Sequence, residues 1–118
     1  MLNSFVENLS VAGIGGAEDP ELTAHWDKCE AAGLPSRLEM AKDGIFRMTR
    51  IPLSAKAVSC TMSGAPGVNG RLDDSGVEDI GALLHFLYPN NWNHFLGDHA
   101  LSFRVLPLSS GETLVTTK

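Results

Sequence analysis

Positive charge and long apolar runs are both scarce in this sequence. The 118 residues include nine Lys and Arg against fourteen Asp and Glu, which gives a formal net charge of −5 at pH 7. An acidic chain without a run of basic residues is a poor partner for nucleic acid or for an anionic membrane, so we expect neither. No apolar stretch approaches the roughly 20 residues of a membrane-spanning helix, and the first residues do not have the pattern of a signal peptide. These absences predict a cytoplasmic protein.

Cysteine is also rare. Cys29 and Cys60 are too far apart in the sequence to form a Cys-x-x-Cys metal or redox motif, so reduced thiols are expected. The glycines of residues 1–18 lack the preceding strand and the spacing of a dinucleotide-binding loop. Residues 1–18 are therefore interpreted as an irregular lead-in.

Residues 19–33 carry the signals of a helix. Asp19 is a good N-cap, Pro20 fits the first helical position, and Gly33 suits a left-handed C-terminus. His25 falls off the apolar stripe of this helix and is expected to be solvated. The stripe has i, i+4, i+7 spacing, is expected to face the core, and consists of Leu22, Trp26 and Cys29.

The pattern changes to that of strands from residue 45 onward. Residues 45–118 predict an antiparallel sheet of about five or six strands, interrupted by a Gly-, Pro-, Asn- and Asp-rich loop near residues 63–79. Residues 56–63, KAVSCTMS, also alternate like a strand. The predicted fold class is α+β, an antiparallel sheet with one N-terminal helix that is short for the task of covering it.

One hairpin can be placed in register from the sequence alone. Gly97-Asp98 fits a two-residue turn with glycine at the first central position. That turn sets His94 opposite Leu101 and Trp92 opposite Phe103, so these side chains share one face. The face is apolar apart from His94 and His99, and buried polar groups need partners.

Three interpretations of the two histidines stay open: pocket lining, a structural role, or metal ligation. Diagonal neighbours across a hairpin meet at one metal only in particular rotamers, so no metal ligand and no catalytic residue is assigned. His85, on the preceding strand, is expected to face the same cavity. The candidate substrate-pocket residues are His85, Trp92, His94, His99 and Phe103. A small metalloprotein that uses the three histidines is a further alternative.

Three stretches carry a family resemblance: DPELTAHWDKCEAAGLPSR, RMTRIPL and YPNNWNHFLGDHALSFRVLPLSSGETLVTTK. They resemble the catalytic domain of Rieske-type non-haem iron oxygenase alpha subunits, the ring-hydroxylating dioxygenases. Within that family, these stretches are most similar in sequence to members that demethylate quaternary ammonium compounds such as glycine betaine. The resemblance implies part of a helix-grip (START/Bet v 1-like) domain that lacks its long C-terminal helix. Residues 1–118 would then be a partial catalytic domain, a fragment of an alpha subunit.

The resemblance also implies cofactors and partners for the parent protein. Its Fe(II) is held by two histidines and a carboxylate, and a Rieske [2Fe–2S] cluster supplies electrons. Neither ligand set is identified in this sequence, so we expect no cofactor in this chain and a chain that is inactive by itself. The expected partners are a small-molecule substrate, a reductase or ferredoxin, and further copies of the subunit. The implied function is the substrate-pocket portion of an enzyme that hydroxylates an aromatic ring or an N-methyl group. The alternative is a non-catalytic ligand-binding or assembly module.

Overall fold

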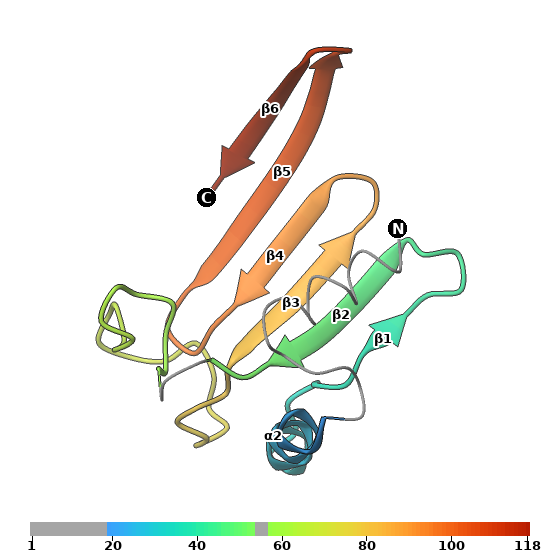
Figure 1. Ribbon diagram of the computed structural model, residues 1–118. Helices are drawn as coiled ribbons and strands as arrows, with labels where there is room; N and C mark the ends of the chain where they lie inside the picture. The colour runs from blue at the N-terminus through green and yellow to red at the C-terminus, as the bar shows by residue number, and fades with distance from the viewer. Residues whose placement is uncertain (1–18, 54–56) are drawn as a thin grey trace.

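Within the residues that the structure describes, the fold is one antiparallel sheet with a helix at one end. The computed structural model describes residues 19–53 and 57–118, so the predicted lead-in at residues 1–18 lies outside the described residues. The described elements are α2 (Pro20–Ala31), β1 (Glu39–Met40), β2 (Phe46–Ile51), β3 (Ala82–Leu87), β4 (Asn91–Phe95), β5 (Ala100–Ser109) and β6 (Glu112–Thr117). Each strand pairs with the next, which makes the sheet a six-stranded meander (Figure 1). The predicted α+β class, with one helix and an antiparallel sheet, is confirmed.

The helix begins and ends where the sequence signals predict. The carboxylate of Asp19 accepts hydrogen bonds from the backbone N–H of Glu21 at 2.8 Å and of Leu22 at 3.4 Å, which caps the N-terminus. Gly33 has a φ of 78° just past the last turn. The predicted apolar stripe is buried, with exposed fractions of 4% for Leu22, 6% for Trp26 and 0% for Cys29. No described helix is long and apolar enough to cross a bilayer.

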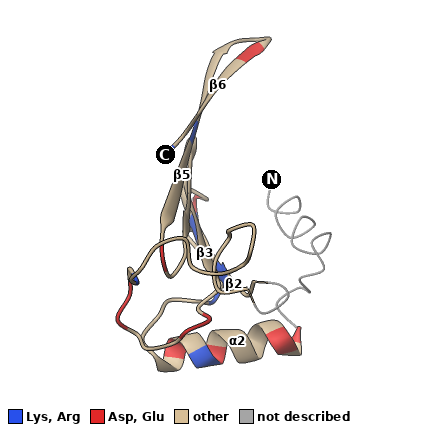
Figure 2. Cartoon of the chain, turned by 90° about the vertical axis from the view of Figure 1, so that its left-hand side faces the viewer, with Lys and Arg blue, Asp and Glu red and all other residues tan. Residues whose placement is uncertain are grey.

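The small core lies where α2 meets the end of the sheet. Figure 2 shows the sheet edge-on, with α2 lying across its lower end. The indole N–H of Trp26 donates to the backbone carbonyl of Arg50 at 2.7 Å. The Arg50 side chain is 3% exposed and donates to the carbonyls of Pro35 and Ile80. Burial lowers the pKa of this guanidinium, and the two carbonyls satisfy part of its hydrogen-bonding capacity.

His25 is buried, and the prediction that it is solvated was wrong. It is 8% exposed, and its Nε2 lies 3.8 Å from the sulfur of Cys29. The cause is the chain segment that leads into β3. Gly81, with a φ of 65°, passes so close that a Cβ there would lie 2.9 Å from the His25 ring and 2.1 Å from the carbonyl oxygen of Ile51. Helical periodicity cannot reveal a distant loop that covers a second face of the helix.

Two further strand assignments differ from the sequence prediction. Residues 57–62 form no strand, because the N–H groups of Val58 and Ser59 both donate to the carbonyl of Gly64 and close a local turn. The loop between β2 and β3 is therefore longer than residues 63–79. The two-residue strand β1 was missed, and it is too short for any periodicity to show.

Candidate functional site: an aromatic sheet face

The β4–β5 hairpin has the predicted register. Trp92 pairs with Phe103, and His94 pairs with Leu101, on either side of the Gly97-Asp98 turn. Directly opposed residues in an antiparallel pair point to the same face of the sheet. Three of the candidate residues, Trp92, His94 and Phe103, therefore lie together on one face.

The adjacent strands extend this surface with further aromatic and apolar side chains. The ring centres of Phe86 and Trp92 are 4.9 Å apart, and those of His94 and Phe103 are 5.1 Å apart. The guanidinium of Arg47 lies over the ring of Phe86, 4.7 Å from its centre. We call this surface the aromatic face and define it as Arg47, Leu84, Phe86, Trp92, His94, Leu101 and Phe103.

The aromatic face is hollowed and partly open to solvent. A shallow depression of about 50 Å³ lies at β2, β3 and β4. It is lined by Arg47, Leu84, Phe86, Trp92 and His94 of the aromatic face and also by Met48 and His85. Trp92 is 36% exposed. Aromatic rings that are exposed at a concave apolar surface can hold an apolar or cationic ligand.

His94 is the titratable group at the centre of this face. Burial lowers its pKa below the ordinary value of 6.5, because removing an imidazolium from water disfavours the charged form. The ring is therefore mainly neutral at pH 7. A neutral imidazole beside Phe103 does not repel a cationic ligand.

His85 lies on the other face of the sheet. It pairs with Asn93, whereas its neighbour Leu84 pairs with His94. Its Nδ1 is 3.2 Å from the amide nitrogen of Asn93, and its ring centre is 5.1 Å from that of Phe46. Adjacent strand positions point to opposite faces, although His85 and His94 are both among the residues that line the depression. The expectation that His85 faces a substrate cavity with His94 stays a prediction.

His99 belongs to a separate cluster at the hairpin turn. Its Nδ1 lies 2.9 Å from a carboxylate oxygen of Asp98, and the Ser59 hydroxyl donates to the same carboxylate at 2.9 Å. The N–H of Gly67 donates to its second oxygen at 2.7 Å. Burial of Asp98 by itself would raise the pKa of the carboxyl, but the hydrogen bonds from Gly67, Ser59 and His99 together lower it.

This cluster is not a nucleophilic site. A nucleophilic serine needs a histidine between its hydroxyl and the carboxylate. Here Ser59 and His99 both bond to Asp98, so the hydroxyl has no base that can remove its proton. The carboxylate instead joins the turn to the loop between β2 and β3. Sequence reasoning did not single out Asp98 or Ser59, and the one available signal was the length of the loop.

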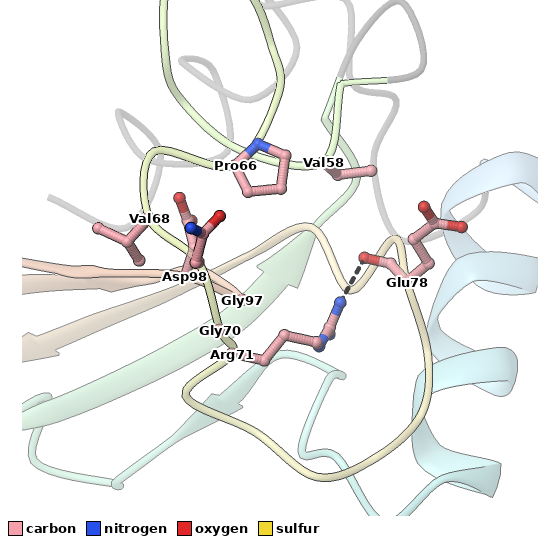
Figure 3. A pocket seen from close by; sticks show the side chains of 9 residues that line it. Val58, Pro66, Val68, Gly70, Arg71, Glu78, Gly97 and Asp98 are labelled. Atoms are coloured by element: carbon pink, nitrogen blue, oxygen red, sulfur yellow. Dashed lines mark hydrogen bonds between the residues drawn. The ribbon is translucent and has the colours of Figure 1, made fainter.

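A larger cavity of about 460 Å³ lies beside this cluster, between the hairpin turn and the loop (Figure 3). Arg71 forms one wall. Its guanidinium donates to the carbonyls of Glu78 and Val77 and to the carboxylate of Asp73. Because those bonds and the bonds to Asp98 lie within the loop and turn, the charged groups of this cavity serve to hold the loop in place.

The described residues fit neither an iron ion nor a Rieske cluster. In the part of the chain that the structure describes, no group of three or more His, Cys, Asp and Glu side chains could hold a metal ion. A three-histidine site is excluded because His85 and His94 point to opposite faces. Cys29 is buried in the core, while Cys60 is exposed in the loop. Burial raises the pKa of the Cys29 thiol, which opposes the thiolate form that binds metals.

Comparison with known proteins gives a consistent result. No family model matches the chain. The chain is 37% identical over 132 aligned positions to the glycine betaine monooxygenase oxygenase subunit of Chromohalobacter salexigens; the match covers 100% of this chain and 27% of that protein. The proteins of the same name from two strains of Pseudomonas aeruginosa are 42% identical over 72 positions, or 61% of the chain and 17% of each relative.

The chain is a relative of Rieske-type oxygenase subunits. The resemblance read from the sequence is thereby confirmed. The chain spans about a quarter of the length of the first of these relatives. In that relative, the region that matches this chain is therefore one segment of a longer protein.

Proposed function

We propose that this chain supplies one wall of the substrate pocket in an oxygenase subunit, with the aromatic face turned toward the substrate. The relatives named above support an oxygenase. The observation that carries the proposal is that Trp92 and His94 line a hollow and that Phe103 lies beside them on the same face of the sheet. In this proposal residues 1–118 are part of a helix-grip catalytic domain. The role of the chain is to bind and orient the substrate.

The substrate class that we propose is a quaternary ammonium compound with a carboxylate, such as glycine betaine. Rings of Trp92 and Phe103 attract a trimethylammonium group by cation–π interaction. His94, mainly neutral at pH 7, adds no opposing charge. Arg47, at the rim of the hollow, provides a positive charge for the carboxylate end.

The reaction that we propose for the parent is hydroxylation of an N-methyl carbon. The hydroxymethyl amine then releases formaldehyde and leaves the demethylated amine. Dioxygen supplies one oxygen atom to the C–H bond, and its other atom leaves as water with two protons and with two electrons from a reductase or ferredoxin partner. The ring hydroxylation that the wider family carries out is the second possibility, and the cationic character of the substrate separates the two.

Ligand titration by NMR tests the binding role directly. We expect glycine betaine to shift the amide resonances of β3, β4 and β5 around Trp92. The carbon isostere 3,3-dimethylbutanoate has the same shape and carboxylate but no positive charge, so it should bind at least several-fold more weakly. Equal binding of both compounds would contradict the cation–π assignment.

Matched variants locate the site on one face of the sheet. Trp92→Leu should weaken glycine betaine binding about tenfold, which is the scale of a desolvated cation–π contact. Phe95→Leu is the control. Phe95 is 41% exposed, and it lies on the other face of the sheet, where its cross-strand partners are Leu83 and Ala100. An equal loss in both variants would place the ligand elsewhere.

A further inference from the structure

His94 lines the hollow of the aromatic face without a polar partner. Its ring centre is 5.1 Å from that of Phe103, and no hydrogen bond or ion pair within the part of the chain that the structure describes involves its ring. The side chain is partly buried, and neither ring nitrogen is sealed from solvent. Polar atoms in a core are normally satisfied by the protein. An unpaired imidazole in the wall of a hollow is instead placed to meet a ligand.

Few charged groups surround this ring. Its cross-strand partners on β3 and β5 are both leucines, and β2 contributes the guanidinium of Arg47 at the rim of the hollow. Toward the turn, the Nδ1 of His99 is bonded to the carboxylate of Asp98, which offsets the charge of a protonated His99 ring. The described residues of β2–β5 place no Asp or Glu on the aromatic face. A positive charge on His94 would therefore have no counter-charge there.

His85 is the other titratable group in the lining of the hollow, but its ring is already engaged. It packs against Phe46, and its Nδ1 lies 3.2 Å from the amide nitrogen of Asn93, which also donates to the side-chain oxygen of Asn91. An amide nitrogen can only donate, so the Nδ1 of His85 is the acceptor. Protonation of His85 would break this bond, whereas protonation of His94 breaks none.

The two protonation states of the His94 ring suit opposite ligands. A neutral imidazole has one N–H and one lone pair, and the lone pair attracts a cation that rests on Trp92 and Phe103. An imidazolium has two N–H donors and no acceptor, so it repels that cation and can donate to an anion. Together with Arg47, a protonated His94 gives the hollow two positive charges and no negative one.

We propose that His94 is a specificity-determining residue whose charge decides which ligand the hollow takes: a quaternary ammonium group when the ring is neutral, and an organic anion when the ring is protonated. The preference for a cation rests on the proposed function, whereas the preference for an anion requires only the hollow with Arg47 and His94. Burial lowers the pKa of His94 below 6.5, so the exchange of ligands falls on the acid side of neutrality.

The coupling between the ring and the ligand works in both directions. A unit charge beside a charged ligand in a partly exposed pocket changes the binding constant about tenfold. By linkage, a ligand whose affinity depends on the protonation of His94 changes the pKa of His94 in return. A bound cation should therefore lower the pKa of His94, and a bound anion should raise it.

NMR titration of the 118-residue chain between about pH 5 and pH 8 tests this coupling. The ring resonances of His94 are followed in the free chain, with glycine betaine, and with neopentyl sulfonate, an anion that has the shape of the trimethylammonium group. Neither ligand titrates in this range. We expect glycine betaine to lower the pKa of His94 and the sulfonate to raise it. A ring that stays neutral down to pH 5, or a pKa that both ligands move in the same direction, would overturn the proposal.

The two ligands also separate this proposal from the substrate proposal. If glycine betaine binds at pH 8 but the sulfonate leaves the pKa of His94 unchanged, the charge of His94 does not select the ligand, and the proposed function is unaffected. If the sulfonate raises the pKa and glycine betaine does not bind, the proposed function is contradicted, and the preference for an anion stands alone.

A pair of matched variants assigns the effect to one histidine. The Gln side chain of His94→Gln keeps a donor and an acceptor but cannot become a cation, so the affinity for glycine betaine should be the same at both ends of the pH range. His85→Gln is the control, and it should keep the tenfold loss in acid that we expect of the unmodified chain. Calorimetric titration measures both variants, after circular dichroism has shown that they are folded. A pH dependence that survives in His94→Gln and disappears in His85→Gln would overturn the assignment to His94.

Discussion

His85 and His94 lie on adjacent strands but point to opposite faces of the sheet. Leu84 is the residue paired with His94, while His85 is paired with Asn93. His94 therefore shares a surface with Trp92 and Phe103, and His85 packs against Phe46 and Asn93. The sheet thus separates two histidines that are close in space, and only His94 belongs to the aromatic face.

The buried His25 and the partly buried His94 make stability depend on pH. Burial lowers the pKa of His94 and of His25 below 6.5, so between their folded pKa values and 6.5 the unfolded chain binds more protons than the folded chain. The contribution of these two histidines to the free energy of unfolding is therefore fully present above pH 6.5, and it decreases as the pH falls below that value. Urea unfolding at pH 7.5 and pH 5 should show this decrease, and His94→Leu should reduce it. A pH dependence that is unchanged in the variant would contradict the shift.

The sequence predicted those parts of the fold that depend on local signals. The capped helix and the β4–β5 register both follow from residue types at short spacing, and the structure has both of them. Burial of His25 and the position of Ser59 depend on contacts across 56 and 39 residues of sequence, to Gly81 and to Asp98 respectively. The hydrophobic periodicity of a helix or strand is a local pattern, so it does not reveal contacts between residues that are this far apart in the sequence.

In the candidate site, too, the residues that could be predicted are those that local signals place. Trp92, His94 and Phe103 could be grouped in advance, because one turn type fixes which residues of a hairpin share a face. The face of His85 could not be derived in the same way, because its strand joins β4 through residues 88–90, for which no register was assigned. Asp98 was assigned only to a turn, since its partner Gly67 lies in a loop with no periodic pattern.

Asp98 should be a strong stabiliser of the loop between β2 and β3. Asp98→Asn keeps the size of the side chain but replaces the carboxylate, whose oxygens bond to Gly67, Ser59 and His99, with a weaker acceptor. We expect a loss of about 1–3 kcal/mol in the free energy of unfolding. Asp74→Asn is the matched control, since Asp74 is exposed in the same loop. Chemical denaturation at pH 7 measures both. A similar, small effect in the two variants would mean that the carboxylate is not needed.

The same carboxylate predicts a second pH effect, in acid. Hydrogen bonds lower the pKa of Asp98 below 3.8 in spite of its burial. The folded protein therefore holds the ionised form more tightly than the unfolded chain does. This contribution to stability is present above pH 3.8 and is lost as the pH falls below it. In Asp98→Asn the acid-induced decrease below pH 3.8 should be smaller than in the unmodified chain, as followed by urea unfolding at a series of pH values.

Gly81 should be the position where one methyl group is most damaging. An alanine there combines a positive φ with a Cβ placed 2.1 Å from the carbonyl oxygen of Ile51, so the backbone of β2 or β3 must move. Gly76→Ala is the control, because Gly76 has a φ of 72° and no atom within 4 Å of its Cβ position. We expect a loss of about 1 kcal/mol for Gly76→Ala from backbone strain alone. Gly81→Ala should lose at least about 3 kcal/mol more, because close packing has no room for the added atom. Urea unfolding of the two variants gives the difference. If it is near zero, the segment before β3 moves freely and does not hold His25 in the core.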